Sequence, residues 1–295
     1  MNNQLLKEQF DQSVHRFQQL AMNTVFEIFI AHPDFNFAQS AAHEAFALLK
    51  QLENDLSRFK ENSDVARINQ LQPGQSTIVS PDTFECLQLC QKLFDLTGRL
   101  FDVGQGDLYD FYKGKQKPAA PLRQGSIRNL RLDRENFSVY CVKDSPSIDL
   151  GGIGKGFALD RMKEFLQDWE INRALLQGGY SSILAFGDMA WPLSIHHIFR
   201  KDELLCRLNL KDAALGASGL AKGPHIVNPL THQPVDPQKA VWILAPKAAI
   251  ADALSTSGLI LAESDLENLQ RKSEIPFEFL IVTPDTILKS NGWLD

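Results

Sequence analysis

The sequence predicts an α+β fold in which mixed or antiparallel sheets pack against helices. Segments with helical hydrophobic periodicity are interspersed with short runs rich in β-branched and aromatic residues. Several of the strand-like runs follow one another closely, as they do in hairpins. No repeat with a period of about 20 to 50 residues is present, which argues against a solenoid or propeller.

The first third of the chain is predicted to contain three helices and a strand. An N-terminal extension over residues 1–20 is expected to be helical, because apolar side chains recur there at helical spacing: Phe10, Val14, Phe17 and Leu20. Residues 23–30 are rich in β-branched and aromatic types and predict a strand. Residues 38–59 predict a long helix. Residues 81–98 predict another, which starts at a proline and stops at a glycine.

The remaining two thirds predict strands interrupted by two further helices. Residues 99–121 are loop-like and rich in glycine, proline and aromatic residues. Helices are expected after Phe157 and over 247–262. The predicted strands are 129–133 and 137–142, which form a hairpin, and 147–150, 174–177, 181–187, 193–198, 205–210, 241–246, 277–284 and 286–290. No shift in composition marks a boundary, so residues 1–295 are predicted to form one domain.

Composition limits the classes of partner. The formal net charge is −6, which argues against nucleic acid or an anionic membrane as the main partner. Any bound anion therefore needs a local site. The chain shows no signal peptide, lipobox or transmembrane segment, so a cytoplasmic location without membrane insertion is expected. The cysteines lack metal-ligand spacing and are expected to be thiols in a reducing compartment: Cys86, Cys90, Cys141 and Cys206.

The segment SIDLGGIGKGFALD, residues 147–160, carries four glycines and Lys155 between a strand-like and a helix-like run. Backbone N–H groups at such a helix N-terminus can bind a phosphate, and glycine lets a ligand approach the backbone. The segment matches neither the dinucleotide fingerprint GxGxxG nor the P-loop. The residues alone leave two interpretations open, a phosphate site or a tight turn with a solvated lysine.

Asp252 and Thr256 lie four residues apart on the predicted helix over 247–262, so their side chains share a face. Carboxylate and hydroxyl oxygens are hard donors of the kind that Mg²⁺ prefers, and Mg²⁺ completes its shell from phosphate and water. The alternative is a threonine that bonds back to its own helix. A further candidate is His225, in GPHIVNPLTHQP; His196, His197 and His232 have weaker cases.

Five segments follow one another in a characteristic order. They are MNTVFEI, LSRFKENSDVARIN, TGRLFDVGQGDL, IDLGGIGKGFALD and ADALST, and they lie within about residues 21 to 290. The fourth closely resembles Asp-Leu-Gly-Gly-Ile-Ala-Lys-Gly-Tyr-Ala-x-Asp. In order and spacing the five resemble the motifs of the ApbE family of FAD:protein FMN transferases.

The resemblance implies an ApbE-like, T-fold-related α+β fold with FAD in a cleft between two lobes. It implies Mg²⁺-dependent transfer of the FMN half of FAD to a threonine hydroxyl of an acceptor protein, with release of AMP. The implied metal ligands are the Gly154 carbonyl, Asp252 and Thr256. The implied catalytic residues are Lys155 and His225. The implied contacts to FAD are Met22, Phe59, Asp102, Gly151, Gly152, Lys155, Ser181 and Ser218.

The sequence departs from the family pattern at several positions. Tyr180 and two serines follow Gly178-Gly179 where the family has an acid. In HIVNPLTH, Asn228 replaces an acid, Leu230 an arginine and His232 a glycine, and Ala217 replaces a threonine before Ser218. The departures leave open a non-catalytic FAD-binding protein or a metal-dependent FAD pyrophosphatase of the same fold. An unrelated α+β scaffold with a chance glycine turn is the remaining alternative.

Overall fold

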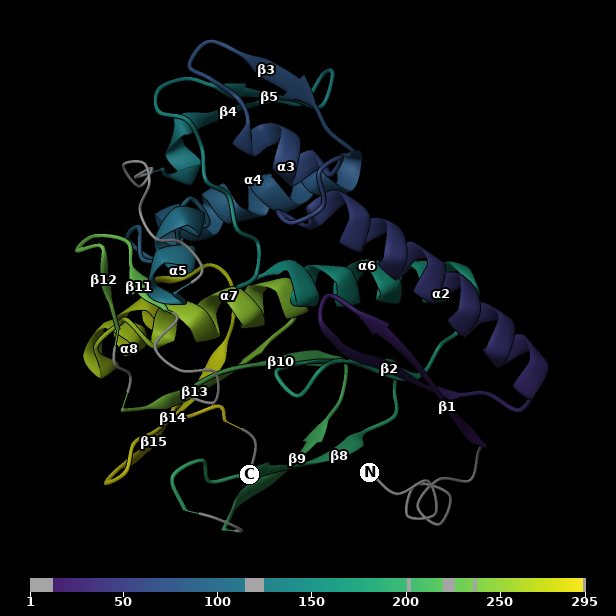
Figure 1. The fold of residues 1–295 in the computed structure, drawn as a ribbon. Coiled ribbons are helices and arrows are strands. Elements are labelled where there is room, and N and C mark those ends of the chain that lie inside the picture. Colours follow the sequence, from purple (N-terminus) through teal and green to yellow (C-terminus); the bar gives the residue numbers. More distant parts are fainter. Residues whose placement is uncertain (1–12, 115–124, 201–202, 220–225, 236–237, 294–295) are drawn as a thin grey trace.

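An eight-stranded antiparallel sheet is the largest element of the computed structural model, which describes residues 13–114, 125–200, 203–219, 226–235 and 238–293. Its strand order is β1-β2-β6-β7-β10-β13-β14-β15 (Figure 1). The strands are β1 (Val14–Ala21), β2 (Thr24–Ala31), β6 (Ala174–Gly178), β7 (Ser182–Phe186), β10 (Ala213–Ser218), β13 (Ala240–Ala245), β14 (Glu278–Val282) and β15 (Ile287–Lys289).

The β1–β2 hairpin stands where the sequence predicts the N-terminal helix. Met22 and Asn23 form its two-residue turn with φ angles of 49° and 59°, as a type I′ turn requires. All eight residues of β1 pair with β2, so pairing overrides the helical spacing of the apolar side chains. The predicted helix is therefore wrong for residues 14–20, and residues 1–12 lie outside the described part of the chain.

Three helices cover one face of the sheet: α2 (Phe35–Leu56), α6 (Gly154–Asp168) and α7 (Ala248–Gly258) (Figure 1). Helix α2 turns a row of alanines and leucines to the core, which suits close packing on its neighbours. Helix α7 is buried on nearly all sides, and its buried residues are mostly small. Of its two polar side chains of interest, Asp252 is buried and Thr256 is half-buried.

A two-stranded ribbon covers part of the other face: β8 (Trp191–His196) and β9 (Leu204–Leu210) (Figure 1). Its inward side chains form a second apolar core with the underside of the sheet. Trp191 is fully buried at the centre of this core. Because side chains alternate along a strand, the large sheet carries one core on each face.

The remaining elements lie beyond the helix layer or around the end of α7 (Figure 1). A three-stranded sheet in the order β3-β5-β4 packs with two helices above α2 and α6. The elements are α3 (Asp64–Asn69), β3 (Ser76–Ile78), α4 (Pro81–Leu96), α5 (Gly106–Tyr112), the 3₁₀ helix η1 (Ile127–Asn129), β4 (Leu130–Asp133), β5 (Ser138–Cys141), β11 (Val227–Asn228), β12 (Gln233–Pro234) and α8 (Glu263–Lys272).

The α+β class with antiparallel sheets is confirmed, and most predicted elements appear within a few residues of their expected bounds. The predicted strand at 147–150 is wrong: this segment is irregular, and its Ile148 N–H donates to the Asn69 side chain at 2.6 Å. Within the described part of the chain, no helix is long and apolar enough to cross a membrane. Cys86 and Cys90 are buried free thiols on α4.

Candidate functional site

The glycine turn at residues 151–153 leads into α6, which begins at Gly154. The Asp149 carboxylate accepts a hydrogen bond from the Gly151 N–H at 2.7 Å. The Leu150 carbonyl accepts from Gly154 N–H at 2.7 Å. The N-cap residue Ile153 makes no side-chain hydrogen bond to the helix, and a helix N-terminus carries partial positive charge that favours an anion.

Asp252 and Thr256 lie on α7, against the start of α6. Asp252 is 5 % exposed, and its Oδ2 accepts a hydrogen bond from the Gly156 N–H at 2.9 Å. Lys155 Nζ lies 3.6 Å from the same oxygen. The Thr256 hydroxyl donates to the Asp252 carbonyl at 3.0 Å. The structure thus brings the glycine turn and the Asp252–Thr256 pair together, although they are about a hundred residues apart in the chain.

One of the glycines, Gly156, is explained by close approach. A Cβ on Gly156 would lie 2.2 Å from the Ala248 carbonyl oxygen, where no side chain fits. A Cβ on Gly152 would make an ordinary contact, at 3.5 Å from Thr256 Oγ1, so the threonine hydroxyl lies against the turn. Gly156 therefore lets the two helices touch.

Three serines complete the polar surroundings of the Asp252–Thr256 pair. Ser182 Oγ lies 2.7 Å and 2.8 Å from the two Asp252 carboxylate oxygens, to which it donates. Ser218 Oγ is 2.9 Å from Ser255 Oγ and 3.4 Å from Thr256 Oγ1. Ser218 is among the predicted site residues, whereas Ser182 and Ser255 are not, because their roles depend on which strand ends lie under α7.

The ion pair with Lys155, at 3.6 Å, only partly offsets the burial of the Asp252 carboxylate. Burial raises the pKa of Asp252, and Lys155, Ser182 and the Gly156 N–H only partly oppose the shift. The described residues contain no group of three acidic, histidine or cysteine side chains suited to a metal. One carboxylate, one hydroxyl and a backbone carbonyl nonetheless fit Mg²⁺, which takes few protein ligands when phosphate and water supply the rest.

Asp160, the last residue of the glycine-rich motif, fixes α7 relative to α6. Its two carboxylate oxygens accept from the N–H groups of Ala248 and Ala249 at 2.8 and 2.9 Å. These are the first residues of α7, so Asp160 caps that helix from another element. Burial raises the pKa of the Asp160 carboxyl to about 6, against the opposing effects of these donors and of Lys247.

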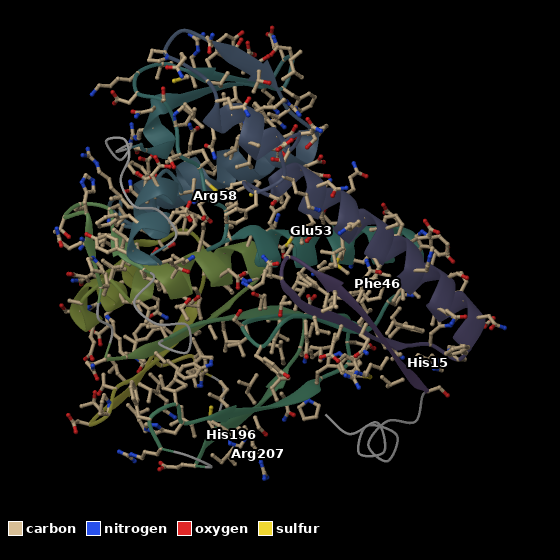
Figure 2. The ribbon with its side chains drawn as sticks, viewed as in Figure 1. His15, Phe46, Glu53, Arg58, His196 and Arg207 are labelled. Atoms are coloured by element: carbon tan, nitrogen blue, oxygen red, sulfur yellow. The ribbon has the colours of Figure 1, made fainter. Side chains whose placement is uncertain are left out.

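Arg58 ties the glycine turn to α5 (Figure 2). Its guanidinium donates to the Asp149 carboxylate at 3.0 Å and the Gly106 carbonyl at 2.8 Å, and it also pairs with Asp110. Arg58 is nearly buried, with a side chain 11 % exposed. Since Asp149 also holds the Gly151 N–H, Arg58 supports the conformation of the turn. The sequence offers no signal for this role, because the three partners come from separate segments.

Three of the predicted FAD contacts lie in defined local environments. The Met22 N–H donates to Glu53 of α2 at 2.8 Å, so the β1–β2 turn is held against that helix (Figure 2). Asp102 is buried, and its Oδ1 accepts from two backbone N–H groups at 2.8 and 2.9 Å. Phe59 is 63 % exposed with the Arg58 guanidinium over its ring.

One other predicted residue, Ser181, is not brought to Asp252. Ser181 lies in the turn after β6 and faces the opposite side of the sheet from Ser182. His225 lies outside the described residues. The predicted cleft between two lobes stays a prediction.

Two of the three departures in HIVNPLTH, at Asn228 and His232, have local structural explanations. Asn228 Oδ1 accepts from the N–H groups of Leu230 and Thr231 at 2.9 and 3.4 Å, so its amide oxygen caps the turn as a carboxylate oxygen would. His232 stands where the family has glycine and has a φ of 57°. Its carbonyl accepts from the Tyr112 hydroxyl at 3.0 Å. Both departures therefore preserve a turn.

Comparisons with known proteins agree on one family. The family model described as "ApbE family" matches residues 22–279. A Klebsiella pneumoniae protein named FAD:protein FMN transferase is 22 % identical over 277 residues, 87 % of each chain. One from Treponema pallidum with the same name is 25 % identical over 296 residues, covering 86 % of this chain and 80 % of its own.

Solved structures agree on the fold. The flavin transferase ApbE from Vibrio cholerae matches with a TM-score of 0.82 at 20 % identity, over 94 % of this chain and 98 % of its own. The ApbE protein from Thermotoga maritima matches with a TM-score of 0.81 at 25 % identity, over 94 % and 97 %.

Proposed function

The chain belongs to the ApbE family, and on that basis we propose that it transfers the FMN half of FAD to a threonine hydroxyl of an acceptor protein. The threonine oxygen forms a bond to the phosphorus of the FMN half, the pyrophosphate bond breaks, and AMP leaves with the bridging oxygen. The observation that supports this most is the contact between the glycine turn and α7, in which Gly156 N–H donates to Asp252.

Mg²⁺ is the proposed metal, held by Asp252, Thr256 and the Gly154 carbonyl. Bound Mg²⁺ would supply Lewis-acid stabilisation of negative charge on the pyrophosphate. The need for a cation is supported by the burial of Asp252, because a desolvated carboxylate with partial compensation favours an added positive charge. Ser182 orients the carboxylate, and the Thr256 hydroxyl is held by its bond to the Asp252 carbonyl.

The chain's own residues supply the other fixed charges. Lys155 and the partial positive charge at the N-terminus of α6 would stabilise negative charge as it develops on phosphate oxygens. Threonine is a weak nucleophile at neutral pH, so a base is required, and His225 is the proposed one. The other proposed FAD contacts are Met22, Phe59, Asp102, Gly151, Gly152, Ser181 and Ser218.

The experiment is incubation of the protein with FAD and Mg²⁺, with and without a threonine-bearing candidate acceptor. Chromatography then separates FAD, FMN and AMP, and flavin fluorescence of the denatured acceptor reports a covalent product. AMP with a fluorescent acceptor supports transfer. Free FMN and AMP identify a pyrophosphatase instead. FAD that stays bound and intact identifies a flavin-binding protein.

A further inference from the structure

A groove of about 970 Å³ lies on the face of the sheet opposite α6 and α7, between the sheet and the β8–β9 ribbon. The apolar side chains at its floor are Phe29, Leu215 and Trp242, which are buried, and Ile183, which is half-buried. Its rim is polar, with Tyr180, His196, Arg207 and Asn209 among its residues. Of the described residues with a proposed role in the chemistry, only Ser181 lines the groove.

The groove borders the candidate site at two strand ends. Ser182 of β7 donates to Asp252 on one face of the sheet, while Ser181 directly before it lines the groove on the other. In the same way, Ser218 of β10 contacts the hydroxyls of α7, while Ala217 lines the groove. Neighbouring residues at the ends of β7 and β10 therefore line the candidate site and the groove, which lie on opposite faces of the sheet.

The rim of the groove has an excess of positive charge. Arg16 pairs with Glu27, which neutralises that carboxylate. Arg207 is exposed and has no ion-pair partner among the residues that the structure describes. The chain as a whole has a formal net charge of −6, so the Arg207 guanidinium, which pairs with none of the described acidic side chains, is a local departure that favours an acidic ligand.

We propose that the groove binds an extended, acidic segment of the acceptor protein next to its modified threonine. An extended segment turns alternate side chains to opposite sides, which matches an apolar floor beneath a charged rim. Passing the turn at residues 179–181 would bring the threonine from the groove to the side of Asp252. This inference rests on the proposed transfer function and adds to it the site that selects the acceptor.

The first experiment measures peptide binding in the absence of FAD. Two fluorescein-labelled twelve-residue peptides contain one threonine and the same apolar residues, one with four aspartates and the other with four lysines. Anisotropy is followed at low salt for the native protein, for Arg207→Glu and for Arg134→Glu. Arg134 is the matched control, because it is exposed in the β4–β5 turn, remote from the groove.

The native protein and Arg134→Glu are expected to bind the aspartate peptide at least about 10-fold more tightly than the lysine peptide. Arg207→Glu is expected to abolish or reverse that preference. No preference in the native protein overturns the proposal, as does an equal loss of preference in both variants.

The second experiment measures FAD affinity by quenching of flavin fluorescence. Unchanged affinity in Arg207→Glu supports a groove that serves the acceptor, whereas a loss of about 10-fold or more assigns the groove to FAD and overturns the proposal. A protein that binds the aspartate peptide and FAD but releases no AMP would contradict the proposed function and still support the groove as a peptide site.

Discussion

At Asp252, three groups contact a buried carboxylate: the Ser182 hydroxyl, the Gly156 N–H and, more distantly, the Lys155 ammonium. Each can reduce the free-energy cost of the charge, yet burial still raises the pKa of the carboxyl. A residue with this environment is better suited to a divalent cation than to a structural ion pair.

Asp252→Asn is expected to lower Mg²⁺ affinity by about 100-fold or more, because the charge and a hard ligand are lost together. Ser182→Ala, which removes only the supporting hydroxyl, is expected to cost about 10-fold to 100-fold. Calorimetric titration of Mg²⁺ in the presence of FAD measures both. Affinity that is unchanged in Asp252→Asn would exclude this residue as a ligand.

Asp160 shows how a single carboxyl makes stability depend on pH. Its folded-state pKa of about 6 lies above the ordinary value of 3.8, so between these values the folded state holds a proton that the unfolded chain has released. Stability is therefore gained as the pH falls from 6 towards 4, and up to about 3 kcal/mol is lost as the pH rises through 6.

Urea unfolding without added Mg²⁺ tests this contribution at pH 4, 5, 6 and 7. The native protein is expected to lose more unfolding free energy between pH 4 and 7 than Asp160→Asn, whose amide does not titrate. Equal pH dependence in the two proteins would assign the loss to other groups.

At the scale of secondary-structure elements, the contact between α6 and α7 determines the site. A Cβ on Gly156 would overlap the backbone of Ala248, whereas a Cβ on Gly154 would meet nothing closer than Leu150 Cβ at 3.9 Å. The two glycines belong to the same motif and the same helix turn, so they form a matched pair.

Gly156→Ala is expected to destabilise the protein by about 1–3 kcal/mol, because the helices must move apart. Gly154→Ala is expected to be neutral or to stabilise by up to about 1 kcal/mol, because alanine favours the helix. Thermal or urea unfolding measures both. Similar effects of the two substitutions would contradict the role of Gly156 as the point of contact.

Elements with a strong hydrophobic periodicity are predicted well from the sequence. Elements whose conformation depends on strand pairing, or that consist mostly of small residues, are not. Helices α2, α4 and α6 carry clear apolar stripes, whereas β10 reads AALGAS and becomes a strand only between β7 and β13. Strand β1 has apolar side chains at helical spacing, but pairing with β2 decides its conformation. Helix α8 buries only Leu266, so its apolar signal is weak.

For the candidate site, too, residues within a sequence motif are predicted, and contacts that depend on the tertiary structure are not. The order of motifs indicates that the glycine turn and α7 belong to one site, and the geometry agrees. Ser182 could not be assigned to it from the sequence, because its partner Asp252 is 70 residues away. Asp160 belongs to the glycine-rich motif, but its contact with the start of α7, 88 residues away, could not be foreseen. Such contacts depend on how β7 and α6 lie beside α7, which no local pattern encodes.

At the scale of the whole molecule, Arg58 joins the region after α2, helix α5 and the glycine turn through Asp110 and Asp149. Arg58→Leu leaves two nearly buried carboxylates without their partner and is expected to cost about 3–5 kcal/mol. Arg128→Leu removes an ion pair with Asp95 whose side chains are 61 % and 59 % exposed, and is expected to cost less than about 1 kcal/mol.

Urea unfolding measures the stability of these two variants. The affinity for FAD reports whether the glycine turn keeps its conformation. Arg58→Leu is expected to weaken FAD binding as well, whereas Arg128→Leu is not. Stability losses of the same size in both variants would show that the ion pairs of Arg58 contribute no more than an exposed surface ion pair does.

The alternation along β7 and β10 has a consequence for how such proteins diversify. Ser182 and Ser218 lie on the side of Asp252, whereas Ala217 and Ile183 face the groove. Substitutions at every second position can thus change one surface and leave the other intact. Related proteins that differ only at the groove positions would bind different acceptor proteins and keep the same chemistry on FAD, because alternate residues of the same two strands serve the two surfaces.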